Sequence, residues 1–190
     1  MTDPRMACFE GDAFGSPDLF KLVERPVPVP APHQVRIRIE ATALGFVDGL
    51  IVQGRYQIKP PLPYVPGGEI AGVVDAVGSA VRHLGVGDRV VTWQLGGGLS
   101  GYAAVAADEA EAVPADLPLA SAAAMLVDYQ TAHYALFERG RILPGETVLI
   151  SGAAGGVGSA AIQLAARAGA HVVALASTPE KRGFALALEA

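Results

Sequence analysis

Residues 148–158 read Val-Leu-Ile-Ser-Gly-Ala-Ala-Gly-Gly-Val-Gly, and an Ala-rich segment leads from there to the apolar run His-Val-Val-Ala-Leu-Ala at residues 171–176. This order predicts a strand, a glycine-rich turn, a helix and a second strand. Gly152, Gly155 and Gly158 recur at every third position, which allows a tight turn and lets backbone N–H groups approach a pyrophosphate at the start of the helix. The stretch therefore predicts the opening of a dinucleotide-binding fold. A strand, turn and helix with packing glycines and no nucleotide is the alternative.

Composition limits the classes of protein that need to be considered. The 190 residues are 51% hydrophobic and 17% charged, with a formal net charge of −5, so a nucleic-acid partner is not expected. No apolar run is long enough for a membrane span, and no secretory signal is visible. Cys8 is the single cysteine, which excludes an internal disulfide and every multi-cysteine metal site. A cytoplasmic protein without a membrane partner is expected.

The first part of the chain has the pattern of short strands. Residues 35–40 alternate strictly between apolar and polar, and residues 69–77 and 88–93 are further apolar runs bounded by glycines and prolines. Strands at this spacing predict a compact, barrel-like domain. The period changes near residue 118, where an Ala- and Leu-rich segment, residues 119–138, predicts one long helix or two. We expect an α/β protein with domains at 1–118 and 119–190.

The end of the second strand of the nucleotide-binding segment indicates which cofactor it selects. NAD sites usually carry an acidic residue there, which holds the ribose hydroxyls. Here the strand ends in Ala-Leu-Ala at 174–176, and Ser177 and Lys181 follow. A hydroxyl and a cation without a carboxylate suit a 2′-phosphate, which predicts NADPH. The alternative is that Ser177 caps the next helix, with Pro179 as its first residue and Glu180 in its first turn.

Other polar residues carry weaker signals. The four histidines form no close pair with one another or with the single cysteine, so a metal site is not expected. Glu69 follows two glycines, and we expect it in a turn that enters a strand, buried in a salt bridge. Asp48 is expected to cap a helix over residues 49–54. Tyr56 has a phenol that could line a pocket, or it could be an aromatic plug under the proline-rich loop at 57–68.

With these residues in view, the chain resembles the medium-chain dehydrogenase/reductases, specifically their zinc-independent NADPH:quinone oxidoreductase branch. The resemblance extends over nearly the whole chain. Its marks are Ala43-Leu-Gly-Phe-Val-Asp48, Gly54-Arg-Tyr56, Leu62-Pro-Tyr-Val-Pro-Gly-Gly-Glu69, Ala71-Gly72, Gly87-Asp-Arg-Val90, Gly101-Tyr102, Asp128-Tyr-Gln-Thr-Ala132 and the glycine turn from Gly152 to Gly158.

The resemblance implies a GroES-like β-barrel domain followed by the first part of a Rossmann domain, a doubly wound parallel sheet that is incomplete here. It implies direct hydride transfer from NADPH to a quinone or a related electron-poor carbonyl or alkene. Gly68 stands where zinc-dependent relatives have a histidine ligand, so no metal is implied. Gly45 stands where the family usually has Asn, which leaves the substrate range open.

The resemblance also assigns residues to the site. Thr131 is expected on the nicotinamide side of the cofactor, and Ser177 and Lys181 at the 2′-phosphate. Asp48, Tyr56 and Gln130 are expected near the acceptor pocket as catalytic or lining residues. The expected contacts of the turn with the cofactor come from Gly152, Ala154, Gly155, Gly156, Val157 and Gly158.

Whole members of this family are longer, so the chain is expected to be an N-terminal portion that is poorly active alone. The complete enzyme is expected to be a homo-oligomer. An enoyl-thioester or alkenal reductase is the nearest alternative, because it differs only in the pocket. A non-catalytic nucleotide-binding or interaction protein is the alternative from another class.

Overall fold

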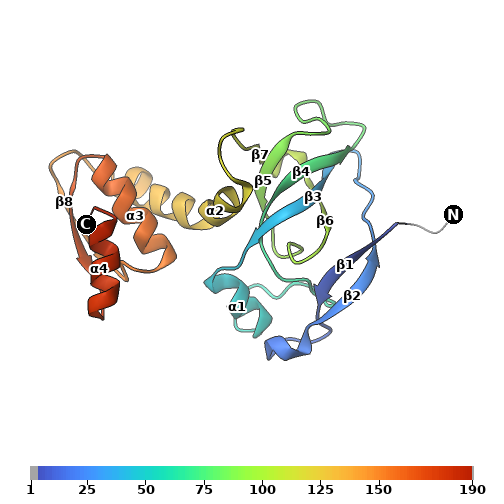
Figure 1. Cartoon of the computed structure of the whole chain (residues 1–190), viewed down its shortest axis with the longest axis horizontal. Helices are drawn as coiled ribbons and strands as arrows, with labels where there is room; N and C mark the ends of the chain where they lie inside the picture. Colours follow the sequence, from blue (N-terminus) through green and yellow to red (C-terminus); the bar gives the residue numbers. More distant parts are fainter. Residues whose placement is uncertain (1–3, 190) are drawn as a thin grey trace. The chain divides into compact units, whose positions relative to one another are not determined.

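The structure is a computed structural model that describes residues 4–189 (Figure 1). The chain divides into two compact units between Leu126 and Val127, inside a helix. The predicted domain boundary at about residue 118 stays a prediction. The elements up to the division are β1 (Arg5–Glu10), η1 (Pro17–Leu19), β2 (Lys21–Pro26), β3 (Gln34–Ala43), α1 (Phe46–Val52), β4 (Glu69–Val77), β5 (Arg89–Trp93), β6 (Tyr102–Ala106), η2 (Ala107–Glu109) and β7 (Ala110–Ala112), with α2 (Leu119–His133) crossing it.

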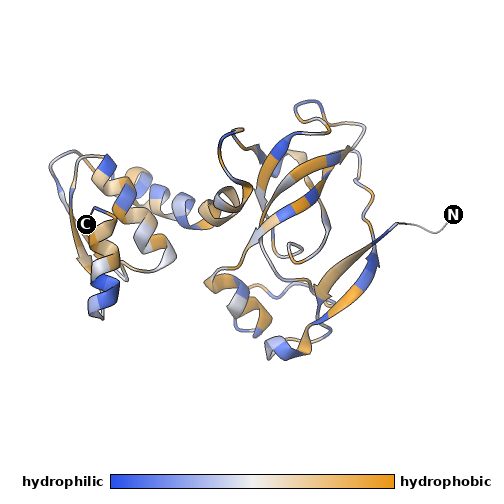
Figure 2. Ribbon diagram, viewed as in Figure 1, coloured by the Kyte–Doolittle hydropathy of each residue, from blue (hydrophilic) through white to orange (hydrophobic). Residues whose placement is uncertain are grey.

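The first unit is built on a five-stranded antiparallel sheet with the strand order β6-β3-β4-β5-β7, and β1 pairs with β2 in a separate two-stranded sheet. Hydrophobic and hydrophilic residues alternate along β3, as Figure 2 shows. Val35 and Ile37 are fully buried in the core, whereas Arg36 between them pairs with Asp75 of β4 at 2.8 Å. The period of two therefore decides which face of this strand meets the core.

The second unit contains η3 (Tyr134–Arg139), β8 (Thr147–Ser151), α3 (Gly156–Arg167), β9 (His171–Leu175) and α4 (Pro179–Ala187). β8 and β9 pair in parallel, with Thr147 opposite His171 and Ser151 opposite Leu175. Parallel neighbours need a crossover connection, and α3 provides it. Ile162 of α3 is fully buried in the core of this unit, where it packs with Ile150 of β8.

The predicted strand at 69–77 is confirmed with the same bounds, and the strand predicted before the glycine turn is β8, Thr147–Ser151. The segment at 119–138 is helical as predicted, but its last part, Tyr134–Arg139, is a π-helix. The prediction of a helix at 49–54 was wrong at its start, because α1 begins at Phe46 with Gly45 as its N-cap. Within residues 4–189, no helix is both long and apolar enough to cross a membrane.

Candidate functional site: a glycine turn at the ends of two parallel strands

The turn after β8 leaves the start of α3 without a capping side chain. Gly152 has a φ of +63°, and Gly155 is the N-cap of α3 with no side-chain hydrogen bond to the helix. The first helical hydrogen bond here runs from the N–H of Ser159 to the carbonyl of Gly155. The N–H groups of the preceding positions, 156–158, therefore have no partner within the helix, and such a terminus favours an anion.

Gly158 allows the helix to lie close to the turn. A Cβ at this position would lie 2.4 Å from the carbonyl oxygen of Gly152 and 2.9 Å from the Cα of Ala153. Both atoms belong to the backbone, so the turn would have to move to accept any side chain. The glycine spacing thus fits a fold in which the backbone itself approaches a phosphate.

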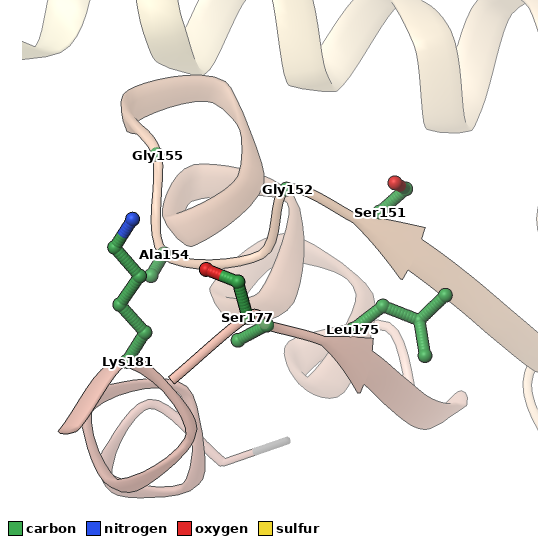
Figure 3. A pocket seen from close by; sticks show the side chains of 8 residues that line it. Ser151, Gly152, Ala154, Gly155, Leu175, Ser177 and Lys181 are labelled. Carbon is green, nitrogen blue, oxygen red and sulfur yellow. The ribbon is translucent and has the colours of Figure 1, made fainter. Parts of the chain in front are cut away.

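A pocket of about 580 Å³ lies beside this turn, at the carboxyl ends of β8 and β9 (Figure 3). Lys181 of α4 extends its side chain alongside Ala154, and the Ser177 hydroxyl points toward the same part of the turn. The two strands are parallel, so their carboxyl ends share one edge, where such folds bind ligands. The lining residues are Ser151, Gly152, Ala154, Gly155, Leu175, Ala176, Ser177 and Lys181.

The structure thus brings five residues of the predicted cofactor set into one pocket: Gly152, Ala154, Gly155, Ser177 and Lys181. Ser151 and Leu175 also line this pocket but were not predicted as site residues. Their positions as the last residues of two paired parallel strands were the signal that could have found them.

The cap of α4 differs from the alternative considered for Ser177. Thr178 is the N-cap, and its hydroxyl accepts a hydrogen bond of 3.3 Å from the N–H of Lys181. The cap assignment to Ser177 was therefore wrong by one residue, and its hydroxyl is exposed at the pocket. Hydrogen bonds from its own backbone N–H and from Thr178 lower the pKa of Glu180, in the first turn of α4.

The residues predicted on α2 lie elsewhere in the second unit. Gln130 lines a separate, shallow groove of about 520 Å³ on the helix surface. Thr131 is exposed and lines neither this groove nor the pocket at the turn. The other lining residues of the groove are Tyr129, His133, Tyr134, Glu138 and Leu164.

The first unit holds a smaller pocket of about 290 Å³ that Gly45 and Asp48 help to line. Tyr56 is not among its lining residues, but packs against a buried cluster that includes Ile51 and Tyr64. This position corresponds to the aromatic plug that the sequence left as an alternative. The rest of the lining is mostly apolar: Phe9, Pro17, Phe20, Leu44, Gly49, Val52, Gln53, Pro66 and Leu99.

Asp48 has a different local role from the one expected. It is the third residue of α1, and its Oδ2 accepts a hydrogen bond of 2.8 Å from the N–H of Gly45. Its Oδ1 accepts from the N–H groups of Gly67 and Gly68 at 3.2 and 3.1 Å. The expectation that Asp48 precedes and caps the helix was wrong, because glycine takes the N-cap position and the carboxylate reaches back to it.

Metal-ligating side chains are dispersed in the part of the chain that the structure describes, where no three of the types His, Cys, Asp and Glu lie close enough to share an ion. Glu69 follows Gly68, the position where zinc-dependent relatives have a histidine ligand, and is buried at 7% exposure. Cys8 is buried in β1.

Comparisons with known proteins agree with this architecture. Residues 31–116 match the alcohol dehydrogenase GroES-like domain. A quinone oxidoreductase of Sus scrofa is 41% identical over 175 residues, which are 91% of this chain and 53% of the relative. The chain spans about half the length of the curated relatives that it matches.

Two solved structures extend the comparison. Quinone oxidoreductase of Escherichia coli, complexed with NADPH, matches with a TM-score of 0.88 at 34% identity, over 96% of this chain and 56% of that one. CurK enoyl reductase matches with a TM-score of 0.88 at 33% identity, over 97% of this chain and 57% of that one.

The fold and the turn pocket define a protein with a GroES-like domain joined to the opening of a dinucleotide-binding domain. Within that class, the chain is similar over most of its length to quinone oxidoreductases of the medium-chain dehydrogenase/reductase family.

Proposed function

We propose that the chain is the NADPH-binding and acceptor-domain part of an oxidoreductase that passes hydride to a quinone or a related electron-poor carbonyl or alkene without zinc. The observation that carries this proposal is the uncapped start of α3 beside a pocket lined by Ser177 and Lys181. The Escherichia coli relative that binds NADPH supports it.

The residues present fit the cofactor. The free N–H groups at the start of α3 would hold the diphosphate, and the absence of a side chain at Gly158 lets the backbone approach it. Ser177 and Lys181 would hold the 2′-phosphate by charge-assisted hydrogen bonds. NADPH supplies the hydride when bound. Thr131 at the nicotinamide, and Gln130, Asp48 and Tyr56 near the acceptor, are proposed from the family alone.

Zinc independence is part of the proposal. It rests on Gly68 at the position of a histidine ligand in zinc-dependent relatives and on the burial of Cys8, the single cysteine, in β1. Elemental analysis of purified protein tests it, since stoichiometric zinc would contradict it. A quinone or enone acceptor, a homo-oligomeric state of the complete enzyme and a cytoplasmic location remain predictions.

Cofactor binding is the direct test of the proposed function. Isothermal titration calorimetry with NADPH and NADH should give tighter binding of NADPH, and absence of binding of either would overturn the proposal. Oxidation of NADPH by 1,2-naphthoquinone, followed through nicotinamide absorbance, then tests the acceptor.

A 2-enoyl thioester is a second candidate acceptor, because an enoyl reductase shares this fold over 97% of the chain. Reduction of a crotonyl thioester in preference to 1,2-naphthoquinone would favour this candidate. Binding of NADPH with no turnover of either acceptor would favour a non-catalytic nucleotide-binding protein.

A further inference from the structure

A carboxylate lies against the first residue of α3. A Cβ built on Gly156 would lie 1.9 Å from Oδ2 of Asp128 and 2.5 Å from its Cγ. Asp128 belongs to the part of α2 that lies in the second unit, so both residues are in one compact body. The missing side chain of Gly156 therefore makes room for the carboxylate of Asp128, directly beside the glycine turn.

No cation forms an ion pair with this carboxylate in the described part of the chain. Burial raises the pKa of Asp128, and no cation or hydrogen-bond donor among residues 4–189 acts to lower it. A partly buried carboxylate without a charged partner keeps part of the cost of its desolvation. Its negative charge is also weakly screened, because it is partly withdrawn from solvent.

The start of α3 attracts negative charge, and a diphosphate bound there would lie close to the carboxylate that rests against Gly156. The N–H groups of residues 156–158 have no partner within the helix, and they define where an anion would lie. Two like charges a few ångströms apart in a partly buried site repel each other.

We propose that Asp128 limits the affinity of this site for nucleoside diphosphates and dinucleotides, because its carboxylate against Gly156 opposes the charge of the bound diphosphate. This inference rests on the proposed function of the turn as the diphosphate site. Asp128 thereby favours release of the nucleotide, so that the site can exchange it.

The test compares the dissociation constants of three probes for the unmodified chain and the Asp128→Asn variant, measured by calorimetry. ADP and NADP⁺ should bind about three- to tenfold more tightly to the variant, the scale of one like charge removed in a partly solvated site. Adenosine should bind equally to both proteins, because it has no phosphate. The gain for ADP should shrink as salt concentration rises, since salt screens the repulsion.

Three further variants separate charge from shape. Asp128→Glu keeps the charge and should give no gain. Asp116→Asn removes an exposed carboxylate in the other unit and should also give none. Asp128→Ser also removes the charge, with a smaller side chain, and should give the same gain in affinity for ADP. It replaces the Asn variant if that variant does not fold.

Unchanged or weaker binding of ADP to the charge-removing variants, with clear binding to the unmodified chain, would overturn the inference and leave the proposed function intact. An equal gain for adenosine would also overturn it, because the effect would then not be electrostatic. Absence of binding of ADP and NADP⁺ to every protein would overturn the proposed function, and the inference with it.

Discussion

The carboxylate of Asp48 accepts a hydrogen bond of 3.1 Å from the backbone N–H of Gly68, twenty residues further along the chain. The same side chain also bonds the N–H groups of Gly45 and Gly67, so it joins the first turn of α1 to the loop before β4. Among the residues that the resemblance places near the acceptor, Asp48 thus has a clear positioning role: it holds the loop that carries Gly68.

Replacement of Asp48 by Ala should destabilise the first unit by about 1–3 kcal/mol, because three backbone donors lose their acceptor. Urea unfolding followed by the fluorescence of Trp93, the single tryptophan, measures this change. Asp116→Ala, which removes an exposed carboxylate, should leave the midpoint unchanged. An equal midpoint for Asp48→Ala and the unmodified chain would show that the three bonds do not stabilise the unit.

Local patterns in the sequence were sufficient for the strands and the glycine turn. The bounds of β4 and β8 follow from apolar runs between turn residues, and the turn follows from the spacing of Gly152, Gly155 and Gly158. Capping was predicted less well, because Ser177 and Thr178 are equally suited to cap α4 and only backbone geometry decides between them.

The contact between Asp128 and Gly156 could not be predicted. The two residues are twenty-eight positions apart, and their contact depends on how α2 packs against the start of α3. Nothing in the local pattern of either segment specifies that packing. The roles of individual acceptor-site residues are hard to predict for the same reason. Asp48 and Tyr56 are close in sequence, yet only Asp48 lines the pocket.

The stability of the first unit should fall at high pH because of Tyr64. Burial, with a smaller contribution from the charge of Asp48, raises the pKa of Tyr64 from 10.0 to about 12. Between these values the unfolded chain releases the phenolic proton and the folded chain keeps it, so the free energy of unfolding decreases as pH rises, by about 2–3 kcal/mol in total.

Tyr64→Phe should remove this part of the pH dependence. It should not destabilise the protein at neutral pH, because the buried hydroxyl has no hydrogen-bond partner among the described residues. Denaturant unfolding at several pH values measures the effect, with Tyr134→Phe, at an exposed tyrosine, as the control. A parallel pH profile for Tyr64→Phe and the unmodified chain would contradict the assignment.

Two glycines of the second unit should respond in opposite directions to substitution by Ala. Gly158→Ala should destabilise the unit by about 1–3 kcal/mol, because its Cβ would collide with the backbone of Gly152 and Ala153. Gly183→Ala in α4 should stabilise it by about 0.5–1 kcal/mol, since its Cβ would meet nothing within 4 Å and the helix loses a flexible residue. Thermal unfolding followed by circular dichroism compares the two, and shifts of the same sign would contradict this account.

Gly45→Asn should change the range of acceptors and not the stability. Gly45 has a φ of −104°, which any residue adopts, and a Cβ there would come no closer than 3.8 Å to Asp48 and 3.9 Å to Glu69. The free energy of unfolding should therefore change by less than about 0.5 kcal/mol. The added amide should narrow the pocket of about 290 Å³. In the proposed complete enzyme, KM should therefore rise more for bulky quinones than for 1,4-benzoquinone. Equal changes in KM for both would show that Gly45 does not set the size of the site.

Lys181→Ala should weaken NADPH binding by about 1–3 kcal/mol, the scale of a charge-assisted hydrogen bond, and leave NADH binding nearly unchanged. The reason is that the Lys181 side chain extends along the pocket beside Ser177, where the second strand ends without a carboxylate (Figure 3). Arg182→Ala is the matched control, because it removes a cation from the same turn of α4 that does not line the pocket. Calorimetry with both cofactors separates the cases. Equal losses of binding free energy for NADPH and NADH would place Lys181 at a part of the cofactor that the two share. Equal losses in Lys181→Ala and Arg182→Ala would show that Lys181 only contributes to a general attraction of anions.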